Sequence, residues 1–282
     1  MQPSPFLFHN TKFLSANQPL ILADNRSFRY GDGCFETMKW LDGRLLLADF
    51  HWERLFSTLD QLGFDVPPHF TTAFLLETIG QLVKKNKQEK GARIRLTVYR
   101  GEGGLYDAVS DAPRLLVQSW PLPLGHDQWN SNGLDIGIYP LAVKPKDAFS
   151  GLKTNQFLPY VMAAKWARQH HWNDALLCNP NGGIADSTIA NLFLLEKGRL
   201  LTPALSEGPI AGVMRRKILQ VARTGGWSVS EQSIQPADLL TAGEVFLSNA
   251  IHPMRWVKSF QDKTYRADQT LELWRELMRS MG

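Results

Sequence analysis

Apolar residues recur along this chain with two different spacings, and these spacings predict both strands and helices in its first half. Alternating or short apolar runs predict strands over residues 18–23, 34–40, 44–48, 93–99 and 114–119. The Asp42–Gly43 dipeptide, between two of these runs, is a hairpin signal. A helical spacing appears at residues 49–62, stopped by Gly63, and again at residues 70–86.

The second half continues this mixture after a stretch rich in proline and glycine. That stretch, residues 120–128, is the predicted linker between a small domain over residues 1–119 and a larger domain over residues 129–282. Strands and helices are mixed without a regular β-α-β order, so the predicted class is α+β. The predicted strands cover residues 133–140, 174–179, 190–196, 199–202 and 243–248, and the predicted helices cover residues 155–170, 211–224 and 267–280.

The composition narrows the class of protein without identifying its chemistry. The chain has 282 residues, of which 44% are hydrophobic and 21% charged, and its net charge of +4 gives no preference for nucleic acid or membranes. Cys34 and Cys178 are too few for a disulfide framework, and no metal site is predicted. No apolar run reaches the ~20 residues of a membrane span, and the N-terminus is unlike a signal peptide. We therefore expect a cytoplasmic protein.

Two residues suggest chemistry when they are considered together. Lys153 lies between a strand-like stretch and a helix, and Asp186 follows about thirty residues later in a predicted turn before an apolar strand. A lysine that forms a Schiff base and an acid at the ring nitrogen are what pyridoxal phosphate requires of a protein. Taken alone, Lys153 is better explained as a surface lysine, and Asp186 as an ordinary acid in a turn.

A phosphate clamp is the third requirement of that cofactor. The glycine-spaced loop at residues 208–216 runs into a helix, and its backbone N–H groups at Val213 and Met214 are candidate phosphate donors. Arg54 on the first long helix is a candidate phosphate partner. The alternative for the loop is a plain helix N-terminus without a ligand. The alternative for Arg54 is a solvated arginine.

Several of these segments, in this order, resemble the class IV aminotransferase-like family, the fold type IV pyridoxal phosphate enzymes. The resemblance runs from about residue 18 to residue 257. It implies two domains, a small N-terminal α/β sandwich and a larger C-terminal pseudo-barrel with helices. The matching segments are YGDGCFET at 30–37, HWERLF at 51–56, GLKTN at 151–155, GIADSTIANLF at 183–193, TP at 202–203, GPIAGVMR at 208–215 and EVFLSNA at 244–250.

The resemblance implies a role for each matching residue. Lys153 would carry the cofactor, and Asp186 would contact the ring nitrogen where relatives usually have Glu. Asp is one methylene shorter, which removes about 1.5 Å of reach. Phe157 lies near the position where several relatives carry a tyrosine, so the hydroxyl that could bond the cofactor from that side is absent. Arg54, Val213, Met214, Ser248 and Asn249 would hold the phosphate.

Within the family, the segments at residues 31–35, 99–104 and 248–253 look like those of aminodeoxychorismate lyases. These enzymes cleave 4-amino-4-deoxychorismate to 4-aminobenzoate and pyruvate, with the lysine as general base. That substrate carries two carboxylates, and Arg100 and then Arg29 are the predicted substrate-binding residues. An aminotransferase acting on branched-chain or D-amino acids is the alternative, and a non-catalytic binding protein on the same fold is a minor one. The family also implies a homodimer and a small-molecule substrate.

Overall fold

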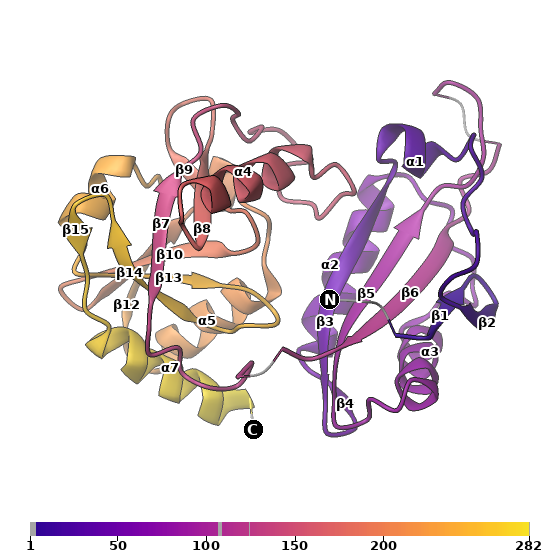
Figure 1. Cartoon of the computed structure of the whole chain (residues 1–282), viewed down its shortest axis with the longest axis horizontal. Coiled ribbons are helices and arrows are strands. Elements are labelled where there is room, and N and C mark those ends of the chain that lie inside the picture. Colours follow the sequence, from indigo (N-terminus) through magenta and orange to yellow (C-terminus); the bar gives the residue numbers. More distant parts are fainter. Residues whose placement is uncertain (1–3, 107–108, 124, 282) are drawn as a thin grey trace. The chain divides into compact units, whose positions relative to one another are not determined.

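The computed structural model describes residues 4–106, 109–123 and 125–281, which form two compact units (Figure 1). The first unit comprises residues 1–124 and 153–156, and the second comprises residues 125–152 and 157–282. Helices and strands are mixed in both units, so the predicted α+β class is confirmed. Two details differ from the predicted boundaries. Residues 153–156 belong to the first unit, and the predicted linker begins inside a strand that runs to Pro121.

The first unit is built on a six-stranded antiparallel sheet with the order β2-β1-β6-β5-β3-β4. Asp42 and Gly43, with φ values of 47° and 82°, form the turn of the β3–β4 hairpin, as the sequence predicts. The elements are β1 (Phe6–His9), β2 (Lys12–Ser15), α1 (Arg26–Tyr30), β3 (Gly33–Leu41), β4 (Arg44–Leu45), α2 (Ala48–Gln61), α3 (Thr72–Lys85), β5 (Gly91–Tyr99) and β6 (Arg114–Pro121).

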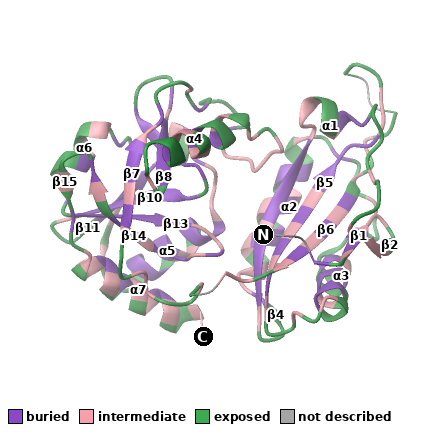
Figure 2. Ribbon diagram, in the orientation of Figure 1, coloured by how far each residue is buried: buried purple, intermediate pink, exposed green. Residues whose placement is uncertain are grey.

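One face of this sheet is covered by helices and the other carries polar side chains. Alternate residues of β5 are fully buried and half-buried, as the colours along that strand show (Figure 2). Ile94 and Leu96 belong to the same hydrophobic cluster as Leu59 of α2 and Ile79 of α3. Their strand neighbours Arg93, Arg95 and Thr97 point to the opposite face, because successive side chains of a strand alternate.

The second unit is built on a nine-stranded mixed sheet, with the order β12-β11-β10-β13-β14-β7-β8-β9 and β15 paired to β14. The terminal strand β9 also packs against β10 and β11, so the sheet curls toward a partly closed barrel. The strands are β7 (Leu134–Ile138), β8 (Asp174–Cys178), β9 (Ile184–Ser187), β10 (Asn191–Glu196), β11 (Arg199–Pro203), β12 (Ser228–Gln232), β13 (Glu244–Ser248), β14 (Arg255–Phe260) and β15 (Lys263–Thr264). The helices are α4 (Leu158–Gln169), α5 (Val213–Thr224), α6 (Pro236–Thr241) and α7 (Asp268–Met281), with a 3-10 turn at Leu205–Glu207.

The long elements lie where their periodicity predicts them, and the errors concern short ones. Residues 18–23 do not form a strand, so that prediction is wrong. Asp186 lies inside β9 rather than in a turn. β9 has only four residues, all of them buried, so its sequence shows no alternation that would reveal a strand. The sequence also missed the short elements β1, β2, α1, α6, β12, β14 and β15.

Candidate active site

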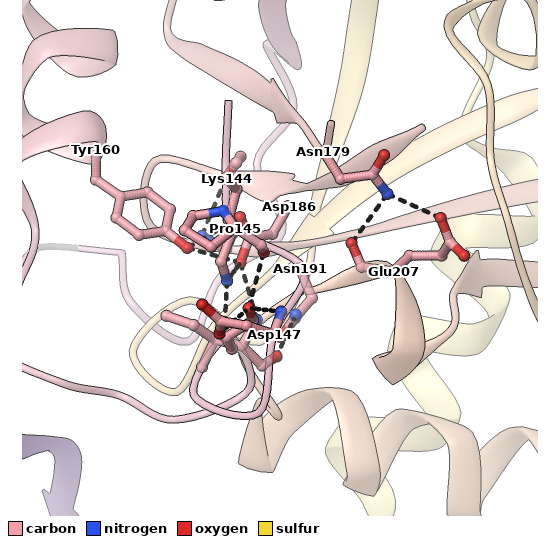
Figure 3. A network of polar contacts seen from close by, with 12 residues as sticks. Lys144, Pro145, Asp147, Tyr160, Asn179, Asp186, Asn191 and Glu207 are labelled. Carbon is pink, nitrogen blue, oxygen red and sulfur yellow. Dashed lines mark hydrogen bonds and ion pairs between the residues drawn. The ribbon is translucent and has the colours of Figure 1, made fainter. Parts of the chain in front are cut away.

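Asp186 occupies the centre of a buried polar network in the second unit (Figure 3). Strand β9 positions it through its pairing with β8, where Asp186 lies opposite Leu177. The residue is 2% exposed. Its carboxylate accepts hydrogen bonds from the Tyr160 hydroxyl at 3.1 Å and from the Ile210 backbone N–H at 3.0 Å. It therefore has the donors that a buried carboxylate requires.

Lys144 completes this network as an ion-pair partner that the sequence did not predict. Its Nζ lies 3.2 Å from Asp186 Oδ2 and donates to the Ser150 carbonyl oxygen at 3.0 Å. Burial lowers the pKa of the Lys144 ammonium, while the adjacent Asp186 carboxylate opposes that shift. Asp186 is 42 residues away along the chain, and no local sequence pattern around Lys144 predicts this ion pair. Tyr160, also missed, supplies a hydroxyl from the helix that follows Phe157.

The loop before α5 is tied to the same network. Ile210 donates its N–H to Asp186, and its carbonyl oxygen accepts a hydrogen bond from the Asn191 side chain at 2.8 Å. A larger residue at Gly212 would displace the Asn191 side chain, because a Cβ at this position would lie 2.0 Å from Asn191 Oδ1. The N–H of Ala211 donates to the Gly151 carbonyl oxygen at 3.0 Å. These contacts fix the loop against the segment that leads to Lys153.

The first turn of α5 has the features of an anion site. Gly212 is its N-cap and provides no side-chain hydrogen bond. The backbone N–H groups of Val213 and Met214, both predicted phosphate donors, have no hydrogen-bond partner among the described residues. Unsatisfied N–H groups and the helix dipole together favour an anion at such a position.

Ser248 and Asn249 follow at the end of β13. Ser248 lies opposite Asn191 in the pairing of β13 with β10 and is 1% exposed. Its hydroxyl has no hydrogen-bond partner in the described part of the chain. Asn249 differs, because its side-chain oxygen already accepts the N–H groups of Ile251 and His252. The Ser248 hydroxyl therefore has hydrogen-bonding capacity left for a ligand.

Lys153 belongs to the first unit, where it packs against the start of β3. Its backbone carbonyl oxygen accepts a hydrogen bond from the Phe35 N–H at 2.9 Å, and Asn155 N–H donates to the Gly33 carbonyl oxygen at 2.9 Å. The Lys153 Nζ lies 4.5 Å from the centre of the Phe35 ring. The side chain is half-buried against an aromatic ring, which partly removes the amine from water.

Arg54 lies in the first unit with two residues that the sequence analysis did not single out. Its guanidinium pairs with Glu36, with Nε donating to Glu36 Oε1 at 2.7 Å. His51 Nδ1 lies 2.7 Å from Glu36 Oε2. Burial alone would raise the pKa of Glu36, but Arg54 and His51 bring it down to about 2. A charged Glu36 inside the apolar run of β3 was the signal that could have revealed this cluster.

Burial lowers the pKa of His51, although its bond to Glu36 acts in the opposite direction. We therefore assign His51 as a neutral ring whose Nδ1–H donates to Glu36 at pH 7. Lys153 is among the cations that lower the pKa of His51 further. Glu36, His51 and Arg54 thus form one buried cluster in the unit that also contains Lys153.

The two arginines predicted to bind substrate occupy different surroundings. Arg100 is 9% exposed and forms ion pairs with Asp32 at 2.8 Å and Asp111 at 2.6 Å. It also donates to the backbone carbonyl oxygens of Leu62 and Gly63. Arg29 is exposed on α1, with its guanidinium 5.0 Å from the Tyr30 ring centre. Their substrate roles stay predictions, and Arg100 already has internal partners for its charge.

Arg95, unlike Arg100, forms no ion pair with an acidic residue in the described part of the chain. Its guanidinium lies 3.6 Å from the centre of the Phe35 ring, the same ring that Lys153 approaches. Burial and the neighbouring Arg93 lower the pKa of Arg95 to about 10. Neither arginine has an acidic partner within the residues that the structure describes. Half-buried cations without a counter-ion favour an anionic ligand.

Two other kinds of site were sought in the described residues. They contain no group of three or more His, Cys, Asp and Glu side chains that could hold a metal ion. None of the helices described is long and apolar enough to cross a membrane.

Comparison with known proteins identifies relatives along most of the chain. The model of a family described as amino-transferase class IV matches residues 33–260. An aminodeoxychorismate lyase of Vibrio harveyi is 29% identical over 229 residues, which cover 80% of this chain and 82% of the relative. A branched-chain aminotransferase of Thermoproteus uzoniensis shares the fold with a TM-score of 0.87 and 20% identity, covering 98% of this chain and 94% of that one. A hypothetical aminotransferase of Mycobacterium tuberculosis in a PLP-bound form has a TM-score of 0.81 and 20% identity, with 98% of both chains covered.

Proposed function

The chain belongs to the class IV aminotransferase family, and on this premise we propose that it is a pyridoxal phosphate-dependent lyase. Its proposed reaction converts 4-amino-4-deoxychorismate to 4-aminobenzoate and pyruvate. The similarity to the Vibrio harveyi lyase supports this choice. The observation that carries it is Arg95, a cation without an acidic partner in the described chain, beside the Phe35 ring that Lys153 approaches.

The residues of the second unit fit pyridoxal phosphate. The buried Ser248 hydroxyl and the N–H groups of Val213 and Met214 lack partners among the described residues, and together they are the donors that a phosphate would need. Asp186 supplies a buried carboxylate for the ring nitrogen. When bound, the cofactor supplies an electron-withdrawing ring that stabilises negative charge at the substrate α-carbon.

Two side chains of the first unit are proposed to act on the cofactor and substrate. Lys153 would hold the cofactor covalently and, once displaced by the substrate amine, take the proton from the substrate α-carbon. Its packing against Phe35 supports this role, because partial desolvation favours the neutral amine, the form that can accept a proton. Arg54, oriented by Glu36, is proposed as a phosphate partner.

Arg95 is the proposed partner of a substrate carboxylate. The substrate carries two carboxylates, and Arg95 is a half-buried cation whose one side-chain hydrogen bond among the described residues goes to the neutral Thr97 hydroxyl, at 3.3 Å. Arg95→Leu is expected to lower kcat/KM by about tenfold to a hundredfold, since a hydrogen bond to a charged group contributes about 1.5–3 kcal/mol. Steady-state kinetics would measure this loss. Arg29→Leu serves as the comparison, and a larger loss from that exposed arginine would assign the role to Arg29 instead.

The alternative function is an aminotransferase for branched-chain or D-amino acids, which would use the same Lys153 as base. The likeness to the Thermoproteus uzoniensis aminotransferase, at 20% identity, concerns the fold. A non-catalytic protein on this fold is the minor alternative. It would leave the unpartnered Ser248 hydroxyl and the donors at the start of α5 without a purpose. The homodimer that the resemblance implies stays a prediction.

One assay separates these functions. Purified protein loaded with pyridoxal phosphate is given 4-amino-4-deoxychorismate without any keto-acid acceptor. We expect 4-aminobenzoate and pyruvate to appear in equal amounts, because a lyase needs no second substrate. Strict dependence on a keto acid would establish the aminotransferase instead. A protein that takes up no cofactor and forms no product would leave only the binding protein.

A further inference from the structure

Arg93 is a second cation on the sheet face of the first unit that carries Arg95, and the proposed reaction assigns it no task. It lies two residues before Arg95 on β5, so both side chains point to the face opposite the helices. The Nε atom of Arg93 is buried and has no hydrogen-bond partner among the described residues. A buried donor without a partner is uncommon in a folded protein, and a bound ligand would satisfy it.

The strands that form this face contribute no acid to it. Within the described strands β3, β5 and β6, Glu36 is the single acidic residue, and it points to the helix face, where it pairs with Arg54 of α2. Lys39 lies opposite Arg93 in the register of β3 with β5, so it belongs to the same face as the two arginines. Burial lowers the pKa of the Arg93 guanidinium. A face with this distribution of charge favours an anionic ligand.

Both guanidinium groups lie near aromatic rings of the neighbouring strands. Arg95 Cζ is 3.6 Å from the centre of the Phe35 ring on β3, and Arg93 Cζ is 5.5 Å from the centre of the Trp120 ring on β6. Contacts of this kind hold an arginine in place without using its N–H groups. Arginines that are fixed in advance lose less conformational freedom when they bind a ligand.

The register of the sheet places the two arginines at different distances from Lys153. Lys153 Nζ lies 4.5 Å from the centre of the Phe35 ring, and Phe35 lies opposite Thr97 on β5. Arg95 comes two residues before Thr97 and Arg93 comes four residues before it. The arginines are therefore about 6.6 Å apart along the strand, since each residue adds about 3.3 Å, and Arg93 is the more distant from the lysine.

This order matches a substrate whose two carboxylates lie at different distances from its amine. In 4-amino-4-deoxychorismate the ring carboxylate is on the carbon opposite the amine, as in 4-aminobenzoate, and the second carboxylate belongs to the side chain next to the amine. We propose, resting on the proposed function, that Arg93 is a specificity-determining residue that binds the ring carboxylate, while Arg95 binds the carboxylate nearer the amine. Together the two arginines select dicarboxylates over monocarboxylates.

Two small anions test this assignment in calorimetric titrations of the protein loaded with pyridoxal phosphate. Isophthalate carries two carboxylates on one six-membered ring, and benzoate carries one. We expect the wild type to bind isophthalate at least about tenfold more tightly than benzoate, because the second carboxylate gains its own charged hydrogen-bond donor. Arg93→Leu should reduce this preference to less than about threefold and leave the affinity for benzoate within about threefold, since Arg95 remains.

Two further variants and a kinetic readout accompany the titrations. Arg168→Leu removes an exposed arginine from α4 and should leave the preference unchanged. Arg93→Gln keeps a polar side chain and should show the same loss as Arg93→Leu, so it decides the question if the leucine variant does not fold. With 4-amino-4-deoxychorismate, Arg93→Leu should raise KM by about tenfold and leave kcat within about threefold, because Arg93 lies away from the reacting amine.

The role of Arg93 and the proposed function fail in different ways. A wild type without a preference for isophthalate, or an Arg93→Leu protein that keeps the preference, would overturn the role of Arg93 even if 4-aminobenzoate is formed. An equal loss of preference in Arg168→Leu would overturn it too, because net charge alone would then attract the anions. A preference that depends on Arg93, in a protein that forms no 4-aminobenzoate, would overturn the lyase and keep the dicarboxylate site.

Discussion

Lys153→Ala is expected to abolish the visible absorbance of the protein loaded with pyridoxal phosphate and to lower its turnover by at least about a thousandfold. The reason is that the variant lacks both the amine that would hold the cofactor covalently and the base proposed for the substrate proton. Absorbance spectra before and after borohydride reduction, together with product formation, measure the two effects. In the wild type, reduction should remove the visible band and the activity together.

The fold of this variant should persist. Lys153 is half-buried, and the contacts that hold its segment to β3 come from the backbone of residues 153 and 155. Thermal unfolding should therefore change by only a few degrees, as is usual for substitutions outside the core. Lys165→Ala, an exposed lysine on α4, is the matched control and should keep colour and activity. A coloured, active Lys153→Ala protein would contradict the assignment of this lysine.

Residue types and chain order were enough to predict the strands β10 and β13 and the helices α4 and α5, but not β9, which contains Asp186. Lys153 and Asp186 could be singled out because the chemistry of one cofactor needs both, and the loop at residues 208–216 because glycines precede a helical pattern. The family resemblance that rested on these segments is confirmed by the family match over residues 33–260. The individual roles of the site residues stay predictions.

What the sequence could not reveal are pairings between distant residues. Lys144 contacts Asp186 across 42 residues, and Arg100 contacts Asp32 across 68. Arg100 was predicted to bind substrate, but its charge is taken up by Asp32 and Asp111. Arg95, by contrast, looks in the sequence like an ordinary polar residue of an alternating strand, with nothing to indicate a role. Only the folded sheet brings its guanidinium to the ring beside Lys153.

Glu36→Gln is expected to destabilise the protein by about 3 kcal/mol at pH 7, the free energy that corresponds to lowering a carboxyl pKa from 4.5 to about 2. The variant keeps a side chain of the same size but leaves the Arg54 guanidinium without its counter-ion inside the unit. Glu36 is 2% exposed, so solvent does little to compensate. Urea unfolding of both proteins at pH 7 measures the difference.

The direction of the Glu36 pKa shift determines how this stability difference changes with pH. Because folding lowers the pKa of Glu36, its contribution is fully present above pH 4.5 and is lost as the pH falls through about 2. The difference between wild type and Glu36→Gln should therefore shrink to about half at pH 3. Glu102→Gln removes a carboxylate that is 38% exposed and 3.7 Å from Arg114, and this control should cost less than about 1 kcal/mol at either pH. A loss from Glu36→Gln that is equal at pH 7 and pH 3 would show that the charge of Glu36 does not stabilise the cluster, and that Arg54 is oriented by packing alone.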